Sequence, residues 1–450
     1  MNRWLVAITA GVIGCLLAGA APASAQGFGV FEQGSCAMGR GGAGVAAPCP
    51  DASGIYFNPA GLSLDRTQIS LGAALIGPKG DFTNSTTSLV SQLKKAWYPV
   101  PNVYASTPIS DKVAAGIGLF APYGLTSEWP LTAEGRFLGY KSVVQAVYVQ
   151  PTLAFKASDR LSIGVGVDVA YVKLQLLQRV DLSRQPITGT PLTFANLGVK
   201  PGTDFANIDL SGTTVSLGAH AGLLYKASER LTLGARVMSS QTPKVDDGKI
   251  KTEQIATGYV LPIPLGPTLP AGVPIDAIVK PQFGPGGKLS NQSASTSLPL
   301  PLQAVAGLAY RASPKVLLLA DYQYVRWSAF DKLVIDGEYL DSTLEEAYRD
   351  THGIRLGTEI ALDEQTVARA GFIVHGAAAP DQTVTPLLPE GKRWLLALGL
   401  GRQLTPHLRL DAAYTYLAQP ERAGRSSDGP NNGVYNFMAH LFGVTFSFGF

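Results

Sequence analysis

The sequence predicts a closed transmembrane β-barrel of fourteen antiparallel strands, with the segment before the first strand folded into its lumen. Three observations favour this all-β class. Charged residues make up only 15% of the 450 residues, against about 25% in a typical soluble domain. After the first 25 residues, no apolar run approaches the roughly 18 residues of a membrane-spanning helix. Short polar turns between alternating strands recur along the chain, as in bacterial outer-membrane barrels.

Residues 1–25 have the pattern of a secretory signal peptide. Arg3 precedes an apolar stretch from Leu5 to Ala20, and Ala23-Ser24-Ala25 is a small-residue cleavage site. The mature chain is therefore expected to begin near Gln26. An alternative is a lipoprotein with Cys15 as the lipidated residue. The formal net charge of +3 gives no reason to expect a nucleic-acid partner.

Residues 26–64 are predicted to form a hatch inside the barrel, and residues 65–450 the barrel itself. The hatch segment is rich in glycine, which allows tight turns and close backbone packing. It cannot bury a core of its own, so it needs a container. It also holds Cys36 and Cys49, which would pair as a disulfide in an oxidising compartment or remain two separate buried thiols.

Six short polar turns set the strand count. Each joins two alternating strands, which gives twelve strands, and a first strand from about Thr67 to Ile76 and a C-terminal strand bring the total to fourteen. The turns are centred on Ser110-Asp111-Lys112, Ser158-Asp159-Arg160, Ser228-Glu229-Arg230, Ser313-Pro314-Lys315, Asp363-Glu364-Gln365 and Thr405-Pro406-His407. The other connections are long, and we expect loops over residues 77–98, 123–141, 179–211, 241–297, 331–350, 377–392 and 418–433.

Alternation within the strands predicts an apolar outer wall and a polar lumen. From Leu161 to Tyr171 the odd positions are apolar, while the even ones are small or polar and include Asp168. Lumen charges of both signs, such as Arg355 and Asp411, are expected to pair around the hatch. The last strand alternates up to Phe450, a pattern that resembles the signal read by the barrel assembly machinery.

Two stretches interrupt the regular pattern. Pro122 lies in the exit of the third strand, GIGLFAPYGL, where proline marks a strand end, an edge or a break. The loop from Tyr259 to Gly286 contains seven prolines and many apolar residues. It is predicted to be stiff and to present an apolar surface, or to pack as a lid.

The hatch carries a set of motifs with a family resemblance. Gly27-Phe28 at the mature start, Gly39-Arg40-Gly41 and Asn58-Pro59-Ala60 follow one another before the first strand. With Trp327-Ser328-Ala329-Phe330, they resemble the long-chain fatty acid transporter family of Gram-negative outer membranes, which includes aromatic-hydrocarbon uptake channels. The resemblance implies gating roles for Gly27, Phe28, Asn58, Pro59 and Ala60, and a structural role for the tryptophan motif.

The resemblance also implies a lateral exit. Family members have a kink in the third strand that opens a gap in the wall, and the matching residues here are Gly118, Ala121, Pro122, Tyr123 and Gly124. Ala121 stands where some relatives have a ligand-contacting serine.

Candidates for binding a ligand carboxylate follow from the same resemblance. Arg349 and Arg179 correspond, the second with an offset, to basic residues that contact the ligand in some relatives. A guanidinium suits a carboxylate, although an arginine in a loop is more often only solvated.

The resulting hypothesis is a passive transporter for hydrophobic small molecules, with long-chain fatty acids first. Alternatives are a channel for aromatic or aliphatic hydrocarbons and, from another class, a plugged porin or adhesin. No catalytic set, metal site or cofactor is expected, because no histidine or cysteine cluster has suitable spacing. The expected location is the outer membrane, in contact with its lipid and lipopolysaccharide.

Overall fold

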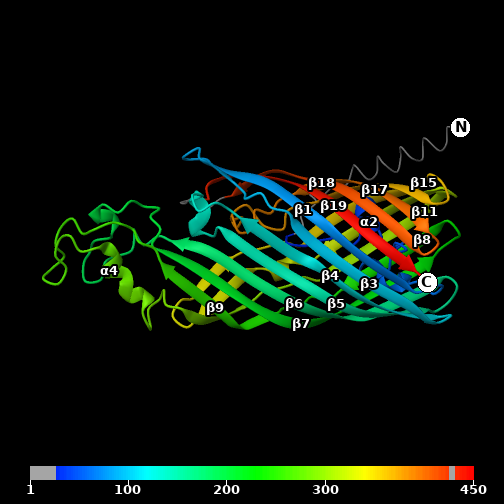
Figure 1. Cartoon of the computed structure of the whole chain (residues 1–450), viewed down its shortest axis with the longest axis horizontal. Coiled ribbons are helices and arrows are strands. Elements are labelled where there is room, and N and C mark those ends of the chain that lie inside the picture. The colour runs from blue at the N-terminus through cyan, green and yellow to red at the C-terminus, as the bar shows by residue number, and fades with distance from the viewer. Residues whose placement is uncertain (1–26, 425–430) are drawn as a thin grey trace.

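The computed structural model describes residues 27–424 and 431–450, so the predicted signal peptide lies outside the described residues. The described chain forms one barrel, seen from the side in Figure 1. Nineteen strands form a single antiparallel sheet, which closes because β1 pairs with both β3 and β19. These nineteen strands make fourteen passes along the wall. Three passes are each split into two strands, and the short strands β2 (Val90–Gln92) and β14 (Ser342–Glu345) are not counted as passes. The predicted fold class is confirmed.

The strands are β1 (Gln68–Asn84), β2 (Val90–Gln92), β3 (Tyr98–Ser110), β4 (Val113–Glu128), β5 (Lys141–Lys156), β6 (Leu161–Val180), β7 (Ala206–Lys226), β8 (Leu231–Met238), β9 (Lys244–Gln254), β10 (Gln292–Ser297), β11 (Gln303–Ser313), β12 (Val316–Val325), β13 (Lys332–Gly337), β14 (Ser342–Glu345), β15 (Thr351–Ala361), β16 (Thr366–His375), β17 (Arg393–Thr405), β18 (Leu408–Gly424) and β19 (Gly433–Gly449). The helices are α2 (Ser35–Gly39), α3 (Gly54–Phe57), η1 (Pro59–Gly61), η2 (Glu134–Phe137), η3 (Ala195–Leu197), α4 (Ile275–Val279), η4 (Lys280–Phe283) and η5 (Trp327–Ala329). Within the described ranges, no helix is long and apolar enough to span a membrane.

The six predicted tight turns all join neighbouring strands, and they define what we call the turn end of the barrel. Their polar first residues close them locally. The Ser158 and Ser228 hydroxyls, for example, accept hydrogen bonds from backbone N–H groups two and three residues later. This is the geometry that favours serine at turns. The opposite end, with the long connections, is called the loop end.

The strands were predicted too short at the loop end. β1 runs to Asn84 instead of Ile76, and the expected loop over residues 241–297 contains β9 and β10. Only about 9 to 11 residues are needed to cross a bilayer. Beyond that length the outward positions turn polar, as in β7, where exposed Val215 is followed toward the loop end by Thr213 and Ser211. The apolar alternation therefore stops before the backbone pairing does.

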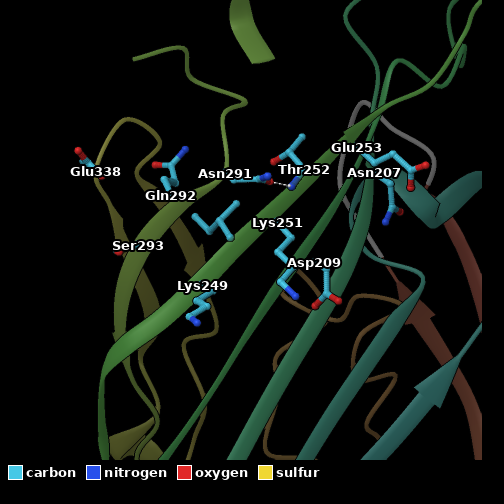
Figure 2. A pocket seen from close by; sticks show the side chains of 11 residues that line it. Asn207, Asp209, Lys249, Lys251, Thr252, Glu253, Asn291, Gln292, Ser293 and Glu338 are labelled. Carbon is cyan, nitrogen blue, oxygen red and sulfur yellow. Dashed lines mark hydrogen bonds between the residues drawn. The ribbon is translucent and has the colours of Figure 1, made fainter. Parts of the chain in front are cut away.

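The polar outer face at the loop end is hollowed between β7, β9 and β10 (Figure 2). The hollow has a volume of about 610 Å³. Charged and amide side chains line it, among them Asp209, Lys249, Lys251 and Asn291. Such a lining does not suit an apolar ligand, so this hollow is not the candidate transport site.

The predicted distribution of side chains across the wall is confirmed. Val165 and Val167 of β6 are exposed on the outer surface, whereas Asp168, the residue after Val167, is buried in the lumen. Lumen charges form a network, as predicted. Arg369 of β16 pairs with Glu359 of β15 and with Asp411 of β18 at 3.1 and 2.6 Å.

Gly27–Leu64 lies within the barrel, enclosed by the wall (Figure 1). It contains only short helices, yet nearly all its residues are buried. The N–H groups of Gly44 and Val45 donate to the Asp321 carboxylate of β12 at 2.8 and 3.1 Å. Wall glycines allow this close approach, because a Cβ at Gly371 would lie 2.2 Å from a backbone nitrogen of the segment.

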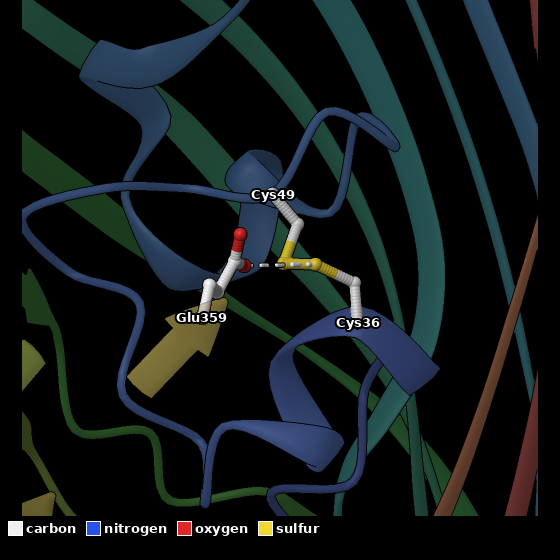
Figure 3. Close-up of side chains that lie close together, drawn as sticks. All are labelled: Cys36, Cys49 and Glu359. Carbon is white, nitrogen blue, oxygen red and sulfur yellow. Dashed lines mark hydrogen bonds between the residues drawn. A yellow bond between two sulfur atoms is a disulfide. The ribbon is translucent and has the colours of Figure 1, made fainter. Parts of the chain in front are cut away.

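Cys36 and Cys49 are joined by a disulfide inside this segment (Figure 3). Glu359 lies beside it and forms an ion pair with the buried Arg40 at 3.0 Å. The two sulfurs and the carboxylate lie close enough to suggest a metal site, but bonded sulfurs are not free thiolates. The cross-link instead closes a loop with a sequence separation of 13 residues.

The proline-rich loop folds back on the loop end and does not lie open. Its helix α4 buries Ile275 and Val279 in a cluster with Leu182 and Phe205 from the preceding long loop. Among its large apolar side chains, Val260 and Ile263 are about half exposed. Most of the predicted apolar surface is thus used in packing between the two loops.

Removal of the cross-link tests how far it orders the hatch segment. In the double variant Cys36→Ala/Cys49→Ala, amide protection over residues 36–49 is expected to fall by about one to two orders of magnitude, because a short closed loop is worth about 2–3 kcal/mol. Hydrogen exchange measured by mass spectrometry checks this. Protection of β6 and β7 serves as the control, and unchanged protection over residues 36–49 would contradict the prediction.

Candidate functional site

The wall is interrupted between β3 and β4. The pairing of these strands ends at Val103↔Leu119, although both strands continue toward the loop end. Beyond this point β3 pairs only with β1, and β4 pairs with β5. We call this the β3–β4 break, with Tyr98–Asn102 on one side and Phe120–Ser127 on the other. It coincides with the third pass, where the family resemblance implied a kink.

Prolines occur on both sides of the break. Pro99 and Pro101 lie in the part of β3 that pairs only with β1. Proline has no N–H, so a strand tolerates it where one edge is unpaired. On the other side, the register of β4 against β5 shifts between Phe120 and Tyr123, so that β4 has one extra residue at Ala121-Pro122. The sequence therefore holds a bulge and a free edge at the same level.

The start of the hatch segment pairs with β4 at this bulge. Gly29 forms an isolated antiparallel bridge with Tyr123. The N–H of Val30 donates to the Pro122 carbonyl at 2.8 Å, and the N–H of Gly124 donates to the Phe28 carbonyl at 2.9 Å. Residues 28–30 thus act as a short extra strand beside the bulge, on the lumen side of the wall.

Phe28 is the centre of a buried aromatic cluster. Its ring lies 4.8 Å from that of Trp327, 5.9 Å from that of Phe330 and 6.0 Å from that of Tyr123, each measured between centroids. All four side chains are almost fully buried. Gly27 must be glycine here, since its φ is +51° and a Cβ would lie 2.6 Å from the indole ring. The result is an apolar, uncharged surface directly behind the break.

Two charged residues hold Gly27 in place. Its N–H donates to the buried Glu390 carboxylate at 3.3 Å, and its carbonyl accepts from the Arg393 guanidinium at 3.2 Å. Glu390 also accepts hydrogen bonds from the N–H groups of Ala378 and Ala379. The loop before β17 is thereby tied to the start of the hatch segment.

The Asn58-Pro59-Ala60 turn ties the other end of the segment to the wall. The Asn58 amide donates to the carbonyls of Val45 and Leu223, at 2.6 and 3.0 Å, and its oxygen accepts from the N–H of Ala60 at 3.1 Å. Facing wall positions are glycines. A Cβ at Gly222 would lie 2.1 Å from the Asn58 side-chain oxygen. Asn58 therefore joins the segment both to itself and to β7.

Neither arginine candidate contacts Phe28 through its guanidinium. Arg349 is exposed and its backbone N–H donates to the Ala378 carbonyl, although the preceding Tyr348 packs against Trp327 and Phe330 of the cluster. Arg179 lies at the loop end of β6, 3.7 Å from the Asp204 carboxylate, to which Arg136 also binds at 2.7 Å. The structure does not bring either guanidinium to Phe28.

A family model described as "Outer membrane protein transport protein (OMPP1/FadL/TodX)" matches residues 16–450. The chain belongs to this family. It is therefore an outer-membrane protein of the kind found in Gram-negative bacteria.

Relatives of known function are distant but match along most of their length. The long-chain fatty acid transport protein of Escherichia coli O6:H1 is 25% identical over 449 residues, with 94% of each chain covered. Outer membrane protein P1 of Haemophilus influenzae is 26% identical over 437 residues, covering 89% of this chain and 88% of that one.

Solved structures share the fold. A FadL homologue of Pseudomonas aeruginosa aligns with a TM-score of 0.81 at 21% identity, covering 94% of this chain and 99% of that one. The toluene transporter TodX of Pseudomonas putida aligns with a TM-score of 0.66 at 16% identity, with 94% and 99% covered. The OMPP1/FadL/TodX architecture thus includes proteins named for different apolar ligands.

Sequence reasoning missed several residues of this site. The tryptophan motif was expected to be structural, and Trp327 packs against Phe28, a contact that the sequence did not indicate. Glu390 and Arg393 gave no signal, because their role depends on contacts more than 360 residues away in the chain. Pro99 and Pro101, read together with Pro122, were a signal in the sequence for a free strand edge.

Asn58→Ala should loosen the hatch turn without opening the barrel. It removes both donated bonds and the turn-closing acceptor, so we expect slower ligand uptake by cells. Heat-modifiable mobility on gels should remain normal, because the wall does not depend on this side chain. Unchanged uptake would remove the turn from the mechanism.

Proposed function

We propose that the protein is a passive transporter that takes long-chain fatty acids across the outer membrane and releases them sideways through the β3–β4 break. The observation that carries this is the combination of a lumen closed by the hatch segment with an interrupted wall beside an apolar cluster. An apolar ligand that reaches Phe28 has a shorter path through the wall than through the packed lumen. Its destination would be a lipid environment and not water.

The residues have distinct roles in this proposal. Gly27 and Phe28 contact the ligand and sense its presence, and Asn58, Pro59 and Ala60 anchor the far end of the hatch, so that the ligand displaces only its start. Gly118, Ala121, Pro122, Tyr123 and Gly124 shape the exit. Arg349 would act earlier, at the loop end, where an exposed guanidinium can attract a carboxylate. Arg179 would act there too, but its side chain is only 15% exposed and a ligand carboxylate would have to compete with Asp204.

A hydrocarbon channel is the second candidate. It is favoured by the uncharged aromatic character of the Phe28 cluster and by Ala121, which offers no side-chain hydrogen bond. A plugged porin or adhesin fits less well. A porin lumen is filled with water, whereas the hatch segment here is buried and bonded to several strands.

An enzymatic role is not proposed, although one arrangement resembles a catalytic triad. His220 lies 2.6 Å from Asp168 and 3.0 Å from the Thr152 hydroxyl. All three side chains are at most 3% exposed, so a substrate cannot reach the hydroxyl. Family members are transporters and channels, and these three side chains are better explained as a hydrogen-bonded polar layer on the lumen side of the wall.

The wall itself suggests its other partners. Exposed apolar side chains around the barrel would contact membrane lipid, and the polar loop end would contact lipopolysaccharide. The terminal strand β19 exposes Phe442, Val444 and Phe446 on one face, and we propose that the barrel assembly machinery reads this pattern.

Deletion of Pro122 tests the lateral exit. It removes the one extra residue of β4, so the strand regains continuous register with β5 while Tyr123 keeps its inward direction. We expect uptake to fall toward background. Deletion of Asp247 is the matched control, because it removes a one-residue bulge in β9, and β9 pairs with β7 and β10 and not with β3 or β4. Equal uptake by both variants would contradict the lateral exit.

Uptake of labelled oleate and toluene by cells producing the protein separates the two ligand classes. Oleate uptake well above that of cells lacking the protein supports the proposal. Uptake of toluene without uptake of oleate would contradict the fatty-acid proposal and support a hydrocarbon channel. Large, steady conductance in a planar bilayer would instead support a porin.

A further inference from the structure

Gln33 is a fully buried side chain of the hatch segment that lies beside the β3–β4 break. Its amide nitrogen donates to the Ala121 carbonyl at 2.7 Å and to the Val30 carbonyl at 3.1 Å. Ala121 belongs to the bulge of β4, and Val30 belongs to the short strand that pairs with it. One side chain therefore joins both members of this pairing.

The bulge creates the need for such a donor. Pro122 has no N–H and the extra residue interrupts the ladder, so the Ala121 carbonyl has no place in the regular pairing with β5. A buried carbonyl without a donor costs free energy. An amide supplies the donor only in one orientation, because the flipped amide would place its oxygen against two carbonyl oxygens.

The backbone of Gln33 is held from the other side of the break. The Tyr104 hydroxyl of β3 donates to the Gln33 carbonyl at 3.0 Å. Tyr104 pairs with Gly118, one residue before the pairing of β3 and β4 ends. Gln33 is thus bonded to β3 through its main chain and to β4 through its side chain, at the corner where the two strands separate.

We infer that Gln33 is a positioning residue that latches the Phe28–Val30 strand onto the bulge and so keeps the β3–β4 break closed from inside. This rests on the proposed function, in which the ligand leaves through the break. For the ligand to pass, residues 28–30 must move away from β4, and the Gln33–Ala121 hydrogen bond must break. Gln33 then sets the rate of release and leaves the choice of ligand to other residues.

Gln33→Met tests the latch, because it keeps the length of the side chain and removes the donor. In purified protein, dissociation of a bound fluorescent long-chain fatty acid should be faster by about three- to tenfold, as expected for the loss of one net hydrogen bond. Amide exchange at Val30 and Gly124 should rise with it. Gln150→Met is the matched control, since Gln150 is equally buried and its amide binds Asp168 of the wall.

Gln33→Glu adds a readout that a general loss of stability would not change. A protonated carboxyl can donate to the Ala121 carbonyl, whereas a carboxylate is repelled by it. Dissociation from this variant should therefore be slow at mildly acidic pH and fast at mildly alkaline pH, while the pH response of the wild type stays small.

The failures of the two proposals are distinguishable. If the wild type does not bind the fatty acid, the proposed ligand class is wrong, and amide exchange at Val30 and Gly124 alone decides whether Gln33 is a latch. If the wild type binds but Gln33→Met and Gln150→Met dissociate and exchange equally, the latch is wrong and the transport proposal stands.

Discussion

The need to satisfy backbone hydrogen bonds inside a membrane-embedded wall governs this structure. A closed barrel meets that need everywhere except where a strand is interrupted, since an unpaired edge in lipid is costly. Here β4 is interrupted at Ala121-Pro122, and the start of the hatch segment supplies the missing partners. The edge of β4 at the break is paired only while residues 28–30 are in place. Opening of the wall at the break therefore requires residues 28–30 to move away from β4, so the two changes are coupled.

The rest of the hatch is held by contacts that are separate from those of its start. Asp321 accepts two of its backbone N–H groups, Arg40 pairs with Glu359, and a disulfide closes its central loop. Asn58 fixes its far end to β7. Residues 27–30 are instead held by Glu390 and Arg393, by the aromatic cluster around Phe28, by the backbone bonds to β4 and by Gln33. Movement at the break thus does not require the whole hatch to leave the lumen.

The wall could be predicted from the sequence because its signals are local. Alternation and serine-led turns depend on neighbouring residues, so six turns and the lumen charges were found correctly. Strand ends at the loop end were missed, because their outward residues are polar and no longer alternate. The proline-rich loop was expected either to expose apolar residues or to pack as a lid, and the loop over residues 181–205 covers most of its apolar side chains.

The site was predictable only in part, because its contacts join residues that lie far apart in the chain. Pro122 marks a break in β4. The side chains that face the lumen have even numbers up to Phe120 and odd numbers from Tyr123 onward, and this change can be read from the sequence once a bulge is assumed. The partners of that break lie far away in the chain. Glu390 and Gln33 show no pattern of their own. Arg179, a candidate for the ligand carboxylate, shares the Asp204 carboxylate with Arg136. Family resemblance located the region, and geometry identified the contacts.

The central claim, that an apolar ligand leaves between β3 and β4, can be tested by trapping the ligand on its way. A photoreactive amino acid placed at Val100, on the free edge of β3, should cross-link to labelled oleate during uptake. The same group at Leu398, on the continuously paired wall of β17, should not. Cross-linking instead at Arg230, in the turn between β7 and β8, with none at Val100, would show passage along the barrel axis and would contradict the account.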